Sequence, residues 1–158
     1  MSNEIEIGRG KRARRVYTFD EIGIVPTRRT RDPELVSTAW TIDAFQFDIP
    51  VLGAPMDSVM SPATAIELGR LGGLGVLNLE GLWTRYEDPS DLLEEVASLR
   101  GLEGTRRLQE IYTESIKPEL VTARIRQIHG AGVVAAASVT PQRTASLTDA
   151  IIDAELDL

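Results

Sequence analysis

The chain has no cysteine, and this absence excludes several kinds of chemistry. Its 158 residues can form no disulfide framework, no thiolate site for a metal and no thiol nucleophile. No apolar run comes near the roughly 20 residues that a membrane-spanning helix needs. The first residues, MSNEIEIGRGKRARR, also lack the apolar centre of a signal peptide. We therefore expect a cytoplasmic protein that does not enter a membrane.

Basic residues are scarce outside the N-terminus. Residues 1–31 hold eight Lys or Arg and four Asp or Glu, a net charge of +4, whereas the rest of the chain holds nine and twenty, a net charge of −11. Nucleic-acid-binding domains normally present a basic face, so this acidic body argues against a nucleic-acid partner. Residues 1–15 are interpreted as a basic, flexible arm whose cations can touch phosphates or simply lie in solvent.

From residue 49 the sequence alternates short apolar runs with capped helices. The runs are IPVLGAP (49–55), LGVLNL (74–79) and VVAAASV (133–139), and continuous runs of this kind are typical of strands buried on both faces in a parallel sheet. Ser-Pro at 61–62 and Thr-Pro at 140–141 each combine an N-cap residue with a proline at the first helical position. The pattern predicts an α/β fold of parallel strands joined by right-handed crossovers.

The remaining segments complete this plan. Residues 16–48 are expected to form a strand-and-loop lead-in, within which residues 35–47 alternate loosely between apolar and polar. Residues 79–133 predict helices that start near Pro89 and Pro118, with a further helix between them. Residues 156–158 look like the beginning of another strand. The single histidine, His129, stands at a predicted helix end, where it can meet exposed carbonyl groups.

Glycine is concentrated between the first two predicted strands. The four glycines of this cluster are Gly69, Gly72, Gly73 and Gly75. In a dinucleotide-binding loop a strand comes first, then the glycines, then a helix whose amides face the phosphate. Here the helix precedes and the strand follows. The cluster therefore predicts a tight helix-to-strand turn.

In a βα architecture, functional loops follow the carboxyl ends of the strands. The first such loop, APMDSVM (54–60), offers Met56 and Asp57 to a ligand. Alternatively, Met56 is a packing residue and Asp57 is a local cap for the following turn. The loop at 139–141 follows the third strand. The loop after the second strand, NLEGLWTRYED (78–88), can bind the ring and phosphate of a ligand or make a subunit contact. Its candidate residues are Asn78, Glu80, Trp83, Arg85 and Tyr86. The residues alone give no complete catalytic constellation and no metal-ligand spacing.

Three segments, taken in order, resemble a known family. YTFDEIGIVP (17–26), IPVLGAPMDSV (49–59) and AIELGRLGGLGVLN (65–78) are similar to the N-terminal part of the IMP dehydrogenase/GMP reductase family. EGLWTRYEDP (80–89) and TPQRTA (140–145) are similar to the branch of IMP dehydrogenase-related proteins. Many dehydrogenases insert a pair of CBS modules after the second helix, and residues 79–133 are too few to hold them. The resemblance is therefore to a branch without CBS modules.

The resemblance implies a fold and a reaction. The fold is a (β/α)8 TIM barrel, usually assembled as a homo-tetramer, that binds a purine nucleotide, IMP or GMP, at the carboxyl ends of its strands. The family moves a hydride between purine C2 and NAD or NADP, and its members use a cysteine in a mobile loop. The sequence holds about three βα units after the lead-in, so we expect residues 16–158 to be the N-terminal portion of the barrel. The cysteine loop and a monovalent-cation site are then expected beyond Leu158.

The resemblance also assigns expected roles to individual residues. Met56 would contact the base or ribose, with Ala54 and Asp57 beside the nucleotide, and Ala54 stands where many relatives place a serine. Asn78, Leu79 and Glu80 occupy positions where dehydrogenases often have a His-rich sequence and reductases have a catalytic lysine, and Leu79 cannot transfer a proton. We therefore expect an IMP dehydrogenase-related oxidoreductase that converts IMP to XMP with NAD, inactive as this portion alone. The alternatives are a GMP reductase, converting GMP to IMP with NADPH, and a non-catalytic half-barrel that binds or assembles with a partner. None of the 158 residues is expected to be catalytic itself.

Overall fold

The computed structural model describes residues 4–25 and 32–158. The chain divides into two compact units, Met1–Ser37 and Thr38–Leu158, and each is described by itself. In the first unit, β1 (Glu4–Glu6) and β2 (Arg12–Arg14) form an antiparallel hairpin in which Glu4 lies opposite Arg14. The basic arm predicted at 1–15 thus contains regular structure, and its flexibility stays a prediction. Two short 3-10 turns follow, η1 (Phe19–Glu21) and η2 (Pro33–Leu35).

A second hairpin opens the larger unit. It consists of β3 (Trp40–Ile42) and β4 (Phe45–Phe47), an antiparallel pair in which Trp40 lies opposite Phe47. The two rings stack with their centroids 4.7 Å apart, and the Trp40 indole N–H donates to the carbonyl of Ile49 at 2.7 Å. Phe47 is buried against Leu74 and Ala136. The end of the predicted lead-in therefore covers the amino ends of the strands that follow.

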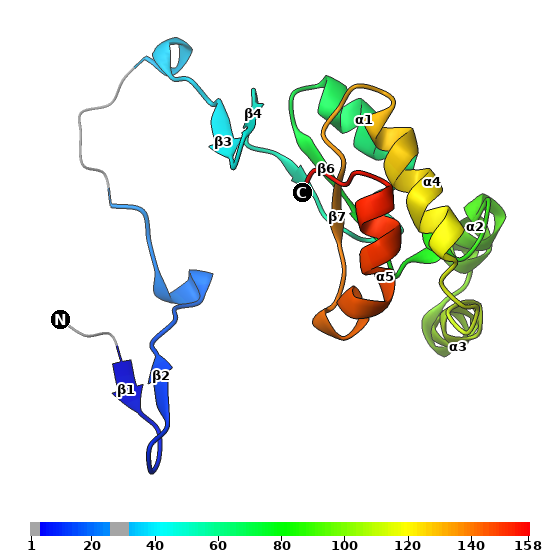
Figure 1. Ribbon diagram of the computed structural model, residues 1–158, viewed down its shortest axis with the longest axis horizontal. Helices are drawn as coiled ribbons and strands as arrows, with labels where there is room; N and C mark the ends of the chain where they lie inside the picture. The colour runs from blue at the N-terminus through cyan, green and yellow to red at the C-terminus, as the bar shows by residue number, and fades with distance from the viewer. Residues whose placement is uncertain (1–3, 26–31) are drawn as a thin grey trace. The chain divides into compact units, whose positions relative to one another are not determined.

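Three parallel strands form the central sheet, in the order β5-β6-β7 (Figure 1). They are β5 (Leu52–Gly53), β6 (Leu74–Asn78) and β7 (Ala136–Ser138). Their order and direction confirm the predicted α/β class. The expectation that the first strand is buried on both faces was wrong. Val51 and Leu52 are 47% and 56% exposed, because β5 lies at the sheet edge and pairs only with β6 in the described part of the chain.

The last three residues extend the sheet on the other side of β7. The Leu158 N–H donates to the carbonyl of Ala135 at 3.2 Å, and the Leu158 carbonyl accepts from the Ala137 N–H at 3.0 Å. This alternation between two positions on the neighbouring strand is the parallel pairing pattern. The expectation that residues 156–158 begin another strand agrees with this pairing.

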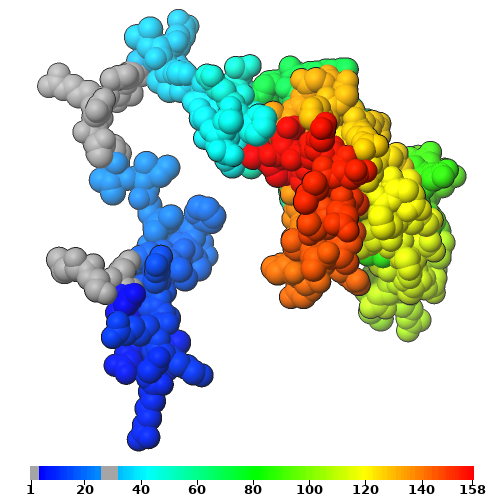
Figure 2. All heavy atoms as spheres, viewed as in Figure 1, coloured from blue at the N-terminus to red at the C-terminus, as the bar shows by residue number. Residues whose placement is uncertain are grey.

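The helices α1, α4 and α5 pack against one face of the sheet. The described residues form α1 (Pro62–Arg70), α2 (Ser90–Ser98), α3 (Gly101–Ile111), α4 (Pro118–His129) and α5 (Pro141–Asp153). Figure 1 shows α1, α4 and α5 beside β6 and β7, and Figure 2 shows α4 and α5 against each other at the surface. None of the helices in the described ranges combines the length and apolar character that crossing a bilayer requires.

Local signals set the ends of these helices. The Ser61 hydroxyl accepts the Thr64 N–H at 3.0 Å, so the predicted cap of α1 is confirmed. The helix ends at Arg70, and Gly72 just beyond it has a φ of +85°, a conformation that glycine adopts at no steric cost. The glycine cluster is therefore a helix-to-strand turn, as predicted. The expected side-chain cap at Thr140 is absent, and the Glu80 carboxylate from another loop instead interacts with both the backbone N–H and the hydroxyl of Thr140.

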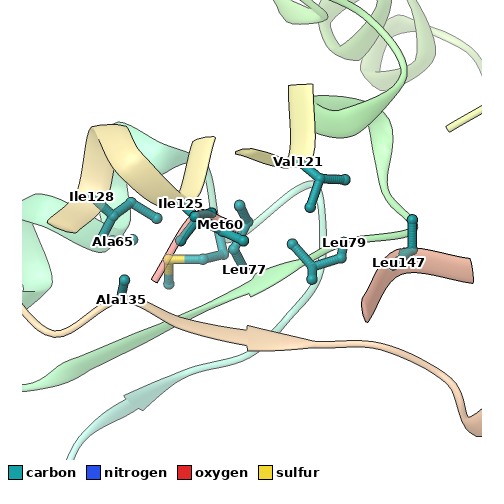
Figure 3. Close-up of a cluster of buried hydrophobic side chains, with 10 residues drawn as sticks. Met60, Ala65, Leu77, Leu79, Val121, Ile125, Ile128, Ala135 and Leu147 are labelled. Atoms are coloured by element: carbon teal, nitrogen blue, oxygen red, sulfur yellow. The ribbon is translucent and has the colours of Figure 1, made fainter. Parts of the chain in front are cut away.

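The core lies between the sheet and these helices (Figure 3). Leu77 and Leu79 of the β6 run point toward Ala65 of α1, Ile125 of α4 and Leu147 of α5. Leu74 and Val76, which alternate with them, lie on the opposite face with Phe47. Side chains alternate along a strand, so Asn78 shares this second face, at the carboxyl end of β6. A polar side chain thus stands where a functional loop begins.

Candidate functional site

The loop after β5 forms a tight turn that presents Met56. The Met56 N–H donates to the carbonyl of Ala54 at 2.8 Å, and the Met56 carbonyl accepts the N–H groups of Val59 and Met60 at 2.9 and 2.7 Å. Met60 at the end of the turn is buried in the core, whereas the Met56 side chain is 55% exposed. The turn therefore fixes its backbone and leaves the predicted ligand-contacting side chain free.

Asp57 is held between two other segments of the chain. One carboxylate oxygen, Oδ2, accepts a hydrogen bond from the hydroxyl of Tyr112. The other, Oδ1, is shielded from solvent and has no hydrogen-bond partner among the described residues. It lies against Gly81, where a Cβ atom would come within 2.0 Å of it. The carboxylate thus fits only because residue 81 has no side chain.

Met56, Asp57 and Asn78 line a single pocket of about 410 Å³. The structure therefore brings together three of the predicted site residues, from the loops after β5 and β6. The facing wall comes from α2, α3 and the residue that follows α3, and it is formed by Leu93, Val96, Ala97, Leu108 and Tyr112. A mainly apolar pocket with a few convergent polar groups is the usual form of a small-molecule site. Ala54 is exposed but does not line this pocket.

Glu80 links the loop after β6 to the loop after β7. Its N–H donates to the Asn78 side chain at 3.0 Å, and its carboxylate accepts the Thr140 N–H at 2.7 Å. Burial raises the pKa of Glu80, but the hydrogen bonds with Thr140 and the positive charges of Arg143 and Arg85 outweigh it and lower the pKa below its usual value. Glu80 is therefore an ionised residue that links the loops after β6 and β7 by hydrogen bonds.

The other candidates of this loop make internal contacts. Arg85 donates to the carbonyls of Glu80, Tyr112 and Glu114. The Tyr86 hydroxyl donates to the carbonyl of Ile111 at 2.9 Å. Trp83 packs against the core, with the guanidinium of Arg124 5.8 Å from its ring centroid. These three residues are placed outside the Met56 pocket, and their predicted ligand or interface role stays a prediction.

Sequence reasoning did not place the α2 and α3 wall in this site, and it missed Tyr112, which donates a hydrogen bond to Asp57. The spacing of Tyr112 suggests only a helical packing residue, and 55 positions separate it from Asp57. No local signal indicates that pairing. His129 behaves as expected of a histidine near a helix end, since its Nδ1 lies 3.2 Å from the Glu155 carbonyl. Within the described ranges, no cluster of three or more His, Cys, Asp or Glu side chains could hold a metal ion.

Comparison with known proteins identifies relatives over almost the whole chain. The sequence profile of the IMP dehydrogenase / GMP reductase domain matches residues 16–158. A protein of Mycobacterium tuberculosis described as an uncharacterized oxidoreductase is 47% identical over 98% of this chain and 42% of its own length. An inosine-5'-monophosphate dehydrogenase of Methanocaldococcus jannaschii is 36% identical over 42% of this chain and 13% of its own length.

The structural comparison agrees. The crystal structure of an IMP dehydrogenase/GMP reductase-like protein from Corynebacterium glutamicum matches with a TM-score of 0.80 and 39% identity, over 98% of this chain and 43% of that one. The predicted fold class is thereby confirmed as part of a (β/α)8 barrel. The chain spans about 42% of the length of the mycobacterial relatives. On the profile match and these identities, the chain belongs to the IMP dehydrogenase/GMP reductase family of oxidoreductases.

Proposed function

We propose that this chain is part of an enzyme that oxidises IMP to XMP with NAD. The observation that carries the proposal is the pocket in which Met56, Asp57 and Asn78 converge. The chain's own contribution is to bind the nucleotide. Met56 offers a polarizable side chain to the base, and Asn78 offers the N–H donors of an amide whose oxygen already accepts the Glu80 N–H. Both stand at the carboxyl ends of neighbouring parallel strands, the usual location of a barrel active site.

The reaction replaces the hydrogen at purine C2 with an oxygen. The C2–H bond breaks and its hydride passes to NAD, water supplies the oxygen, and a proton is released with NADH and XMP. NAD, when bound, supplies the hydride acceptor. We do not assign Arg85 to NAD, because its guanidinium lies over the Tyr112 ring and already donates to three backbone carbonyls. No other residue of this chain is assigned to NAD. The chain holds no cysteine for a covalent step.

Leu79 favours the dehydrogenase reaction over the reductase reaction. By resemblance, this position carries the catalytic lysine of reductases. Here the Leu79 side chain is fully buried in the core against the helices, on the face of β6 opposite to Asn78. It therefore lies away from the pocket and has no group that exchanges protons. The relatives named as inosine-5'-monophosphate dehydrogenases support the same choice.

Two assays on the complete gene product test the proposal. We expect NADH formation at 340 nm that depends on IMP, and no NADPH oxidation that depends on GMP. Replacing Met56 with alanine should raise the KM for IMP, while Val59→Ala, at an exposed position of the same turn, should change it little. GMP-dependent oxidation of NADPH, or a complete lack of IMP turnover and binding, would contradict the assignment. The 158-residue chain alone should show neither activity.

A further inference from the structure

The end of the α2–α3 hairpin is fastened to the loop after β6. The Tyr86 hydroxyl donates to the carbonyl of Ile111, the last residue of α3, and Arg85 donates to the carbonyls of Tyr112 and Glu114. Within the hairpin, the Arg107 guanidinium binds the Glu95 carboxylate through two hydrogen bonds of 2.7 and 2.9 Å. The hairpin is thus internally braced, and these contacts fix where Tyr112 stands.

From this position the Tyr112 hydroxyl reaches the loop after β5. It donates to Oδ2 of Asp57, and in the described part of the chain this is the sole hydrogen bond to that carboxylate. Gly81 lies on the other side, and Oδ1 occupies the space that a Cβ atom at Gly81 would need. A carboxylate confined in this way restrains the backbone of residue 57. Residue 57 adjoins Met56, whose carbonyl anchors the turn through the N–H groups of Val59 and Met60.

We propose that Tyr112 is a positioning residue for the nucleotide-binding turn at residues 54–60 and acts through Asp57. The inference rests on the proposed function, because only that function assigns a nucleotide ligand to this turn. Tyr112 donates its proton and Asp57 accepts it, so the hydroxyl must remain protonated. Burial raises the pKa of Tyr112, the bond to Asp57 and its negative charge raise it further, and the positive charge of Arg85 opposes them. The hydroxyl therefore stays a donor throughout the neutral range.

The hairpin has a second effect through the same residue. Leu93, Val96 and Leu108 form the apolar wall that faces Met56 across the pocket, and Tyr112 stands at the end of that wall. The hydrogen bond between Tyr112 and Asp57 ties this wall to the turn opposite. The width of the pocket between the hairpin and Met56 is thereby fixed, and with it the space for a flat ring. A pocket already shaped before binding reduces the ordering that a ligand must induce.

The test replaces Tyr112 with phenylalanine in the complete gene product. We expect KM for IMP to rise about tenfold, the effect of removing one hydrogen bond to a charged group, while kcat changes less than about twofold. Thr113→Val is the matched control. It removes a neighbouring hydroxyl that donates to the carbonyl of Glu110 and does not reach the turn. Its KM should equal that of the wild type.

A double-mutant cycle tests whether Tyr112 acts through Asp57. Asp57→Ala should raise KM on its own, and Tyr112→Phe added to Asp57→Ala should raise it no further. If the two effects multiply, Tyr112 does not act through Asp57 and the inference is overturned. An unchanged KM in Tyr112→Phe overturns it as well.

Amide hydrogen exchange separates this inference from the proposed function, because it needs no substrate. In Tyr112→Phe the amides of Val59 and Met60, which close the turn, should exchange about tenfold faster, and in Thr113→Val they should not. Unchanged exchange in Tyr112→Phe would overturn the positioning role even if the enzyme oxidises IMP. Faster exchange in a protein that neither binds nor oxidises IMP would refute the proposed function and the nucleotide role of the turn with it.

Discussion

Replacing Gly81 with alanine examines how closely the two loops of the site pack. A Cβ atom at this position would lie 2.0 Å from Asp57 Oδ1 and 2.8 Å from Asp57 Cγ. Nonbonded heavy atoms normally keep about 3.5 Å apart, so the carboxylate would have to retreat by more than about 1 Å. Gly81 has φ −82° and ψ −169°, an extended conformation that alanine adopts freely. The effect is therefore steric and owes nothing to backbone strain.

In Gly81→Ala, the displacement of the Asp57 carboxylate also moves its Oδ2 away from the Tyr112 hydroxyl. Forcing extra atoms into a packed site costs about 1–3 kcal/mol. The loss of this hydrogen bond to a charged group places the expected cost towards the upper end of that range. We therefore expect Gly81→Ala to lower the free energy of unfolding by about 1–3 kcal/mol. Urea denaturation followed by the fluorescence of the two tryptophans, Trp40 and Trp83, measures it.

Gly104 provides the matched control, because it is a buried glycine with room for a methyl group. A Cβ atom there would lie 3.5 Å from the Leu99 Cβ, which is ordinary contact. Gly104→Ala should therefore stabilise α3, by up to about 1 kcal/mol. In an Asp57→Ala background, Gly81→Ala should cost less than about 0.5 kcal/mol, because the clashing carboxylate is gone. If Gly81→Ala proves as harmless as Gly104→Ala, or if its cost persists without Asp57, the packing argument is refuted.

Two further predictions concern the Ser61 cap of α1 and the ionised Glu80 side chain. Ser61→Ala should destabilise the protein by about 1 kcal/mol, since its hydroxyl caps α1. An unchanged free energy of unfolding, measured by thermal denaturation, would contradict this. Glu80 has a lowered pKa in the folded protein, so it contributes stability above its ordinary pKa of 4.5, and that contribution is lost as the pH falls through the folded value. The melting temperature of the wild type should exceed that of Glu80→Gln at pH 7, and the difference should shrink as the pH falls below 4.5. A difference independent of pH would show that the charge is irrelevant.

Local features of the fold could be predicted from the sequence where the signal and its effect lie within a few residues. Ser61 and the proline after it start α1, and Gly72 ends it, because capping depends only on adjacent backbone groups. The same reasoning failed at Thr140, whose position before a proline has the same local form. There the Glu80 carboxylate, 60 residues earlier, interacts with the backbone N–H and the hydroxyl of Thr140, and no local pattern can show that partner. Likewise, the apolar run that contains β5 says nothing about which faces of the strand are covered.

The candidate site follows from the register of β6 more than from its composition. The run LGVLNL is apolar on both faces, so its sequence does not reveal that Leu77 and Leu79 meet the helices while Leu74 and Val76 face the other way. Once that alternation is known, Asn78 is the first polar side chain on the face away from the helices, and it stands where the strand ends. Asp57 could be predicted as a residue of the neighbouring loop, but the role of its carboxylate could not, because Gly81 and Tyr112 confine it from 24 and 55 residues away. Residue types and strand ends therefore located the pocket, whereas its shape depends on contacts between distant segments that only the folded chain brings together.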